Sequence, residues 1–163
     1  PADPKLQTTI FNGFELRAAV APYTGGGYMH TTDDRTPVTF ITRYYLDKIK
    51  RLCDAHGTKL LFVTAPSPVN HTMQRHNEVQ ALADALAVPY LDLNLNTEEL
   101  GIDWNLDTLD GGDHLNYTGC QKATAYLQRY MQTHYTLPDR RDDVRYEAWN
   151  KQAEEFEKLL PQP

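Results

Sequence analysis

Two short apolar runs with a helical pattern between them constrain the fold of this chain most strongly. Residues 59–65 form one continuous run that ends at Pro66, a pattern typical of a strand buried on both faces. Residues 88–93 form the second run, with Pro89 at its start, where a missing N–H group is tolerated. Helical spacing predicts a helix over residues 72–86, between the two runs. Strand, helix and strand in so few residues predict a right-handed βαβ unit with parallel strands.

Helical periodicity also predicts elements on either side of this unit. Apolar side chains between residues 39 and 56 share one face of a helix that ends at Gly57. Residues 1–37 are irregular and include a glycine-rich loop at residues 25–27. We therefore expect one α/β domain over residues 1–138. Residues 139–163 are expected to form a C-terminal amphipathic helix that packs on the domain or on a partner chain.

Composition excludes several classes of function. The chain has 163 residues, of which 40% are hydrophobic, so one globular domain with a substantial core is expected. A net charge of −6 and the absence of a Lys/Arg cluster argue against nucleic-acid binding. No apolar run approaches the roughly 20 residues of a membrane span. Cys53 and Cys120 are too few for a disulfide framework or a zinc site, and no cofactor is expected.

The predicted parallel strands indicate where a ligand would bind. In open parallel sheets, ligands bind beyond the carboxyl ends of the strands. Polar residues follow both strands here, at 66–70 and 92–94, and the loop of residues 107–116 can fold back over them. We call these three loops the rim. The candidate substrate-binding residues on the rim are Ser67, Asn70, Asn94 and Asn116, although Asn116 could instead orient the loop or cap the following helix.

His114 is the candidate catalytic residue of the rim. It lies just before a predicted helix, whose positive end disfavours imidazolium, so a histidine that exchanges a proton there needs a carboxylate beside it. Asp110 and Asp113 are the two within easy reach. The alternative interpretation is a glycine turn in which Asp and Asn are turn formers and the histidine has no role.

This stretch resembles the C-terminal sequence block of SGNH/GDSL-type hydrolases, in a bacterial branch of exported or membrane-anchored proteins. The resemblance rests on Asp110-Gly-Gly-Asp-His-Leu-Asn and its flanks, and it covers roughly residues 40–134. Further matching segments are residues 102–104, 107–108, 122–124, 45–49, 59–66, 82–83 and 90–94. The resemblance implies a flavodoxin-like, three-layer α/β sandwich with a parallel sheet, of which this chain holds the C-terminal part. It also implies an extracytoplasmic or membrane-anchored location, with any anchor outside this chain.

The resemblance further implies an ester hydrolase or acyltransferase that acts on acylated carbohydrate or cell-envelope polymer. His114 corresponds to the general base of that family. The family places its acid three residues before the histidine, where this chain has Gly111. Asp113 would be the partner if the loop turns sharply, and Asp110 if Gly111 and Gly112 form a bulge that returns the chain.

The nucleophile is the missing part of this interpretation. Ser67 is the only serine, and it lies between Pro66 and Pro68, so the following residue offers no N–H group for an oxyanion hole. The family's Gly-x-Asn-Asp block is also unmatched. Either the serine block lies in an N-terminal portion of the same protein outside this chain, or the chain kept the shape and lost the chemistry. We expect the former.

Two other classes of function compete with catalysis. Asp110, Asp113 and His114 could hold a hard cation, but the loop lacks the alternation and the terminal Glu of a calcium loop. His71 and His76 are five residues apart, which misses the i, i+4 spacing of two ligands on one helix face. No metal is therefore expected. A non-catalytic carbohydrate-binding or scaffolding domain fits every residue, although the Asp–His pair weighs against it.

Overall fold

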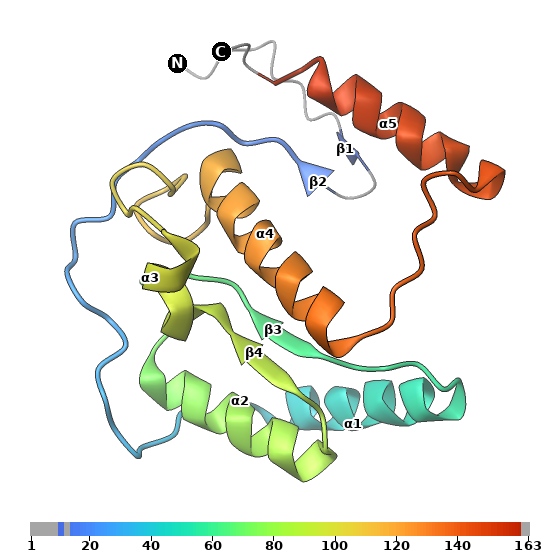
Figure 1. Cartoon of the computed structure of the whole chain (residues 1–163). Helices are drawn as coiled ribbons and strands as arrows, with labels where there is room; N and C mark the ends of the chain where they lie inside the picture. Colours follow the sequence, from blue (N-terminus) through green and yellow to red (C-terminus); the bar gives the residue numbers. More distant parts are fainter. Residues whose placement is uncertain (1–9, 12–13, 161–163) are drawn as a thin grey trace. The chain divides into compact units, whose positions relative to one another are not determined.

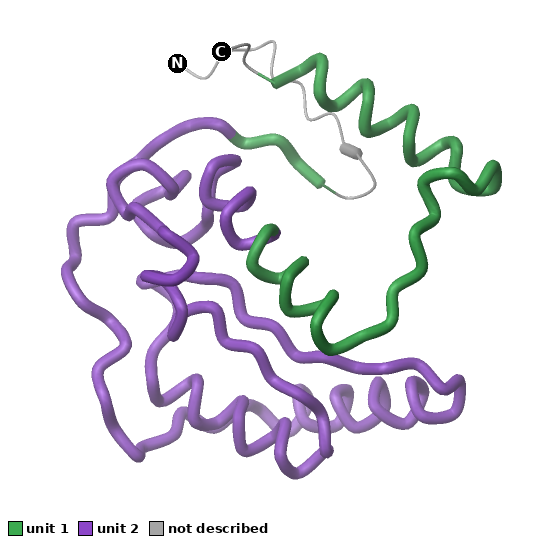
Figure 2. Tube along the Cα trace, viewed as in Figure 1, with its two compact units in different colours: residues 1–17, 125–163 green, residues 18–124 purple. Residues whose placement is uncertain are grey.

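The computed structural model describes residues 10–11 and 14–160. The chain divides into two compact units, which Figure 2 distinguishes by colour. Residues 18–124 form one of them, which we call the α/β unit. Residues 1–17 and 125–163 form the other, which we call the terminal unit. All of the predicted site residues lie in the α/β unit.

The α/β unit is built around a short parallel pair of strands (Figure 1). β3 (Phe62–Thr64) pairs with β4 (Tyr90–Asp92), and Val63 lies opposite Leu91 in the register. The helix between them, α2 (Met73–Leu86), packs against β4. The predicted parallel strand–helix–strand unit is therefore confirmed, and the fold class is mixed α/β. The other elements that belong to this unit are α1 (Phe40–Ala55), η1 (Leu93–Asn96), α3 (Thr97–Leu100) and the first turns of α4 (Tyr117–His134).

Threonine side chains fix the starts of the first two helices. The Thr39 hydroxyl accepts a hydrogen bond from the backbone N–H of Thr42, at 3.1 Å, and caps α1. The Thr72 hydroxyl accepts in the same way from Arg75, at 3.4 Å, and caps α2. Each cap satisfies a backbone donor that the first turn of a helix leaves unpaired. The predicted starts near residues 39 and 72 are confirmed.

The apolar core of the α/β unit surrounds β4. On the apolar face of α2, Leu82 and Ala83 are buried, whereas Val79 and Leu86 are half-buried. The buried apolar residues are Leu82, Ala83, Val88, Leu91, Leu93 and Leu100. They come from α2, the turn before β4, β4 itself and the two short helices after it, so the best-packed part of the unit lies beside the rim.

The prediction that the first strand is buried on both faces is wrong. Val63 at the centre of β3 is 42% exposed, and neither of its strand neighbours is buried. Within the described residues β3 pairs only with β4, so one edge of it lacks a neighbouring strand. The helix α1 shows the same lack of cover, because none of its residues is buried. Its apolar periodicity predicted a helix correctly but did not predict what covers it.

The terminal unit contains two short strands and two helical segments besides the end of α4. β1 (Ile10–Phe11) pairs antiparallel with β2 (Phe14–Glu15). η2 (Val144–Tyr146) leads into α5 (Glu147–Glu157), which is the predicted C-terminal helix. The rings of Phe14 and Phe156 meet edge to face, with 5.5 Å between their centroids. Among the residues that the structure describes, no helix is both long and apolar enough to cross a membrane.

Candidate functional site

Direct hydrogen bonds join the three loops of the rim. The backbone N–H of Ser67 donates to the side-chain oxygen of Asn94 at 2.8 Å, which ties the loop after β3 to the loop after β4. The Ser67 hydroxyl donates to the carbonyl of Gly112 at 3.3 Å, and the Asn70 side-chain amide donates to the Asp113 carboxylate. The expectation that the loop of residues 107–116 folds back over the strand ends is therefore confirmed.

The loop that carries His114 is closed on itself. Thr108 and Leu115 form an isolated antiparallel bridge, and the backbone N–H of Leu109 donates to the carbonyl of His114 at 2.9 Å. Between these ends, Gly111 and Gly112 have φ angles of 75° and 101°, a region that side chains rarely adopt. Two successive glycines thus turn the chain sharply enough to bring residue 110 back to residue 114.

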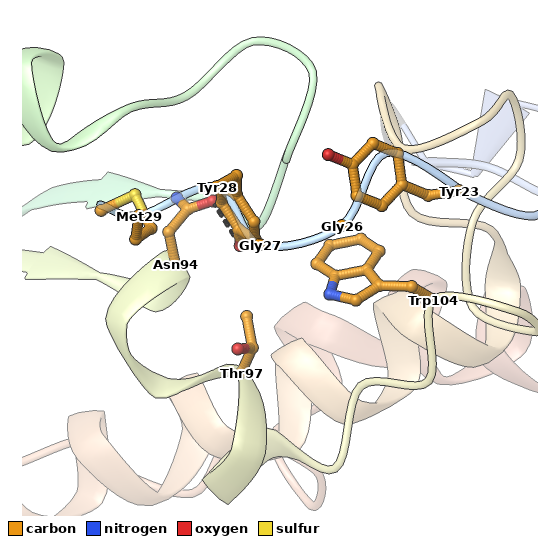
Figure 3. Close-up of a pocket in the computed structure, with 8 residues that line it drawn as sticks. All are labelled: Tyr23, Gly26, Gly27, Tyr28, Met29, Asn94, Thr97 and Trp104. Carbon is orange, nitrogen blue, oxygen red and sulfur yellow. Dashed lines mark hydrogen bonds between the residues drawn. The ribbon is translucent and has the colours of Figure 1, made fainter.

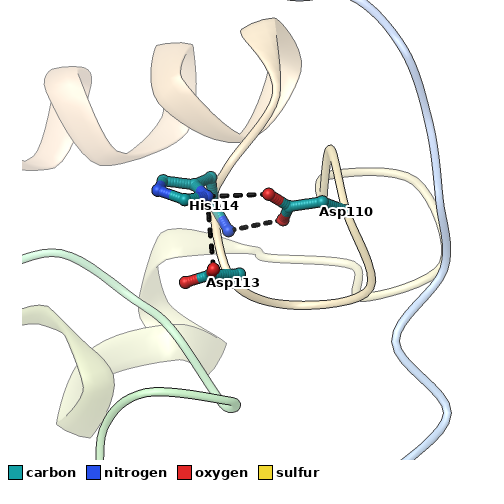
Figure 4. A group of neighbouring side chains, drawn as sticks. All are labelled: Asp110, Asp113 and His114. Atoms are coloured by element: carbon teal, nitrogen blue, oxygen red, sulfur yellow. Dashed lines mark hydrogen bonds and ion pairs between the residues drawn. The ribbon is translucent and has the colours of Figure 1, made fainter.

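Asp110 is the carboxylate that pairs with His114 (Figure 4). Its Oδ2 atom lies 2.7 Å from Nδ1 of the imidazole, and its Oδ1 atom accepts from the backbone N–H of His114, also at 2.7 Å. The nearest Asp113 oxygen is 3.7 Å from Nδ1. The structure thus brings both aspartates to the histidine and gives Asp110 the shorter, two-point contact, as the glycine-bulge alternative anticipated.

This arrangement favours one tautomer of His114. Desolvation raises the pKa of the Asp110 carboxyl, but the hydrogen bonds from the His114 ring and backbone outweigh it, so the pKa lies below its usual value. Asp110 is therefore ionised at neutral pH and accepts a proton carried on Nδ1. The lone pair of the neutral ring is then on Nε2, the nitrogen that a general base uses. The His114 side chain is 67% exposed, so a substrate can reach it.

Ser67 and Asn70 hold the rim loops together. The Ser67 hydroxyl accepts from the backbone N–H of Asn70 at 3.3 Å and sends its own proton to the Gly112 carbonyl. A nucleophilic serine would instead direct that proton at a base. Asn70 is exposed, and its contact with Asp113 orients the second carboxylate beside His114.

Asn94 lies in the rim, but the hydrogen-bonding groups of its side chain already have partners. It is 4% exposed, and its oxygen accepts from Ser67 and, at 3.1 Å, from the hydroxyl of Tyr28. Its amide donates to the carbonyl of Ala65 at 3.0 Å and to the Asp92 carboxylate at 2.8 Å. Asn94 therefore positions the loops that surround the site and has no hydrogen-bonding capacity to spare for a substrate.

Asn116 connects the loop of residues 107–116, which carries His114, to the start of α4. It is 2% exposed, donates to the carbonyl of Leu106 at 2.7 Å and accepts from the backbone N–H of Gly119 at 3.2 Å, which caps the helix. A Cβ at Gly119 would lie 2.4 Å from the carbonyl oxygen of Asp107, so only glycine permits this close approach. Of the roles left open for Asn116, its contacts are those of an orienting and capping residue.

A largely buried cluster around Asp92, a residue of the rim, was missed by sequence reasoning. Oδ2 of Asp92, at the end of β4, lies 2.8 Å from Nε2 of His71 and 2.8 Å from Nδ1 of His76, and it accepts from the Tyr90 hydroxyl at 3.1 Å. With Asn94, these residues form what we call the Asp92 network. Desolvation raises the pKa of Asp92, but hydrogen bonds from His71 and Asn94 outweigh it and lower the pKa.

The sequence feature that could have revealed this cluster is the position of its residues relative to the ends of the predicted strands. The five-residue spacing of His71 and His76 argues only against two metal ligands on one helix face and does not address a shared partner elsewhere in the chain. In the structure His71 precedes α2 while His76 lies in its first turn, and both reach Asp92, the last residue of β4. The rule that strand ends meet at one edge of a parallel sheet could have brought them together.

Asp110, Asp113 and His114 could together offer ligand atoms to a cation. One such atom from each lies within 4.8 Å of the others. The 2.7 Å between Nδ1 of His114 and Oδ2 of Asp110 is the separation of a strong hydrogen bond with a proton between the atoms. A cation bound to both would have to displace that proton, so the geometry fits proton transfer better.

No protein-family model, curated protein or solved structure matches the chain. The functional conclusion therefore rests on the geometry of the site and on the motif that carries it.

Proposed function

We propose that this chain supplies the general base and its carboxylate to an SGNH-type ester hydrolase or acyltransferase. The observation that carries the proposal is the two-point contact between Asp110 and His114 at the carboxyl ends of two parallel strands. In this role His114 takes the proton of the nucleophile through Nε2 and later gives it to the leaving group. Asp110 holds the ring in the correct tautomer and stabilises the imidazolium that forms.

The nucleophile is proposed to come from a portion of the same protein outside these 163 residues. Ser67, the only serine, directs its hydroxyl proton at Gly112 and is followed by a proline. Cys120 is no better placed, because burial raises the pKa of its thiol and its sulfur donates to the carbonyl of Leu115. An added segment that carries the serine would complete the triad.

The same added portion would complete the sheet. We propose a flavodoxin-like, three-layer SGNH sandwich, to which this chain contributes β3, β4 and their helices. The free edge of β3 and the uncovered apolar side chains of α1 support this, because a two-stranded parallel sheet is marginal and parallel sheets are normally covered on both faces. The substrate class we propose is an acylated carbohydrate or cell-envelope polymer. From the resemblance alone we also propose an extracytoplasmic or membrane-anchored location.

A fluorophosphonate probe and an activated ester test this proposal. Both are applied to the 163-residue chain and to a longer parent protein that contains it, and the labelled residue is mapped by mass spectrometry. We expect labelling and turnover only in the parent, at a serine outside this chain. Labelling of Ser67 with turnover in the isolated chain would overturn the assignment of the nucleophile.

Substitutions in the parent test the base. His114→Ala should lower kcat/KM by about 10³-fold, since a general base and the activation of the nucleophile are both lost. Asp110→Asn should lower it by about 10²-fold or more, whereas Asp113→Asn should have a much smaller effect. His134→Ala is the matched control, because that histidine lies at the end of α4 and bonds to the carbonyl of Tyr130. Unchanged hydrolysis by His114→Ala would support the alternative, a carbohydrate-binding domain without catalysis.

A further inference from the structure

An aromatic pocket lies in the α/β unit beside the rim (Figure 3). Its volume is about 440 Å³, within the range of roughly 300–1,000 Å³ typical of small-molecule sites. Its walls come from the glycine-rich loop near residue 25, from the helices after β4 and from the loop before residue 107. The residues that define it are Tyr23, Gly26, Tyr28, Asn94, Thr97 and Trp104.

Three aromatic rings give the pocket its chemistry. Trp104 meets Tyr23 edge to face, with 6.2 Å between the ring centroids, and meets Tyr28 in the same way at 6.0 Å. The Tyr28 hydroxyl is held by its hydrogen bond to Asn94, so this ring has a fixed position. Aromatic faces of this kind stack on the C–H faces of a pyranose ring. Thr97 and the backbone of the glycine loop add polar groups for sugar hydroxyls.

Tyr23 connects the pocket to the loop of residues 107–116, which carries His114. The backbone N–H of Tyr23 donates to the carbonyl of Trp104 at 3.0 Å, and that of Gly111 donates to the carbonyl of Ala21 at 2.9 Å. The Tyr23 ring lies so close to Gly112 that a Cβ there would be 2.8 Å from it. A ligand against the Tyr23 wall of the pocket is therefore next to the loop that carries the candidate base.

We propose that this pocket binds a pyranose ring of a neutral carbohydrate and so places its acyl-bearing part at the rim. The inference rests on the proposed function for the ligand class and goes beyond it in naming the site. Aromatic rings also bind cations, but none of the residues that line this pocket is acidic, so no charge here favours a cation over a neutral sugar.

Tryptophan fluorescence tests the proposal directly. The chain has two tryptophans, so Trp149→Phe leaves Trp104 as the only reporter. This variant is titrated with neutral trisaccharides of glucose, N-acetylglucosamine, xylose and mannose, and separately with choline. We expect a saturable change with at least one trisaccharide. A response to none of them, or to choline alone, would overturn the proposal.

Calorimetric titration of variants then locates the binding. Trp104→Ala should weaken the affinity for the responding trisaccharide at least tenfold, and Trp104→Phe should weaken it less, which keeps the test usable if the alanine variant folds poorly. Trp149→Ala is the matched control, because that tryptophan lies in α5 of the terminal unit. Unchanged affinity in both Trp104 variants would overturn the proposal.

One further variant separates this proposal from the proposed function. His114→Ala should bind the trisaccharide as tightly as the unsubstituted chain, since the sugar pocket is built from other residues. If the sugar binds but the parent protein hydrolyses no ester, the pocket stands and the catalytic proposal fails. If the parent hydrolyses esters and no sugar binds, the reverse holds.

Discussion

The Asp92 network and the helix α1 lie in the same α/β unit and are built in opposite ways. In the network, a carboxylate whose side chain is 1% exposed accepts hydrogen bonds from two histidines, and no buried side-chain nitrogen or oxygen among the described residues lacks a partner. In α1, apolar side chains such as Ile41 and Leu52 are 65% and 61% exposed. In the Asp92 network, polar side chains are therefore buried and hydrogen-bonded, whereas on α1 apolar side chains are exposed to solvent.

This contrast shows where the structure is self-sufficient. A buried carboxylate persists only when its hydrogen bonds are complete, so the network must already hold its native arrangement. An apolar helix face gains its stability from burial, which the described residues do not provide. The Asp92 network is thus complete within the described residues, whereas α1 and the edge of β3 present surfaces that a further segment could cover.

Removal of the central carboxylate should have the largest effect. Asp92→Ala leaves the buried His71 and Asn94 and the part-buried His76 with unpaired hydrogen-bonding groups, so we expect a loss of about 3–5 kcal/mol in the free energy of unfolding. Urea denaturation followed by circular dichroism measures it. Asp47→Ala is the matched control, because that carboxylate forms an exposed ion pair on α1 and should cost at most about 1 kcal/mol. Equal losses in the two variants would contradict the difference described between the Asp92 network and α1.

Loss of the Asn116 side chain should have the next largest effect. Asn116→Ala removes the cap of α4 and the hydrogen bonds to backbone carbonyls of the histidine loop, and we expect a loss of about 2 kcal/mol. The same denaturation experiment measures it. Asn105→Ala is a control from the same region, since Asn105 is exposed and bonds only within its own turn. A change below about 0.5 kcal/mol at Asn116 would show that the loop is held by other contacts.

Local pattern explains how much of this organisation could be predicted. Apolar periodicity predicted α1 and α2, and two bounded apolar runs predicted the parallel pair, because these features depend on neighbours in the sequence. The choice of Asp110 over Asp113 could not be made, since it depends on the φ angles of two glycines within a folded loop. The Asp92 network joins residues 16 and 21 positions apart, which no local period reveals. Nor does periodicity tell whether an apolar face has a partner to cover it.

Acid should remove the contribution that the Asp92 network makes to stability. Because the pKa of Asp92 is lower in the folded protein than in the unfolded chain, the unfolded state binds more protons in acid. This contribution to stability is complete above the unfolded value of about 3.9 and is lost as the pH falls through the folded pKa. Urea midpoints measured between pH 7 and pH 2 should fall less steeply for Asp92→Asn than for the unsubstituted chain. An Asp47→Asn variant should keep the unsubstituted slope, and if both variants kept it, Asp92 would not be the source.

Substitution on α1 should have the smallest effect on stability. Ile41→Lys and Leu52→Lys change side chains that are already mostly exposed, so each should shift the free energy of unfolding of the 163-residue chain by no more than about 0.5 kcal/mol. Leu82→Ala, at a buried position of α2, is the contrasting variant and should cost roughly 2–5 kcal/mol.

The same two lysine substitutions become informative in a longer parent protein. If a further segment covers α1 there, a lysine at residue 41 or 52 must be buried without a partner, and the cost should rise to several kcal/mol. The difference between the loss of unfolding free energy in the 163-residue chain and the loss in the parent then measures how much of the apolar face of α1 is covered. A cost that stays below about 0.5 kcal/mol in both would mean that the face remains in solvent. The exposed helix would then be a property of the complete protein, and the proposed sandwich would have to be built without it.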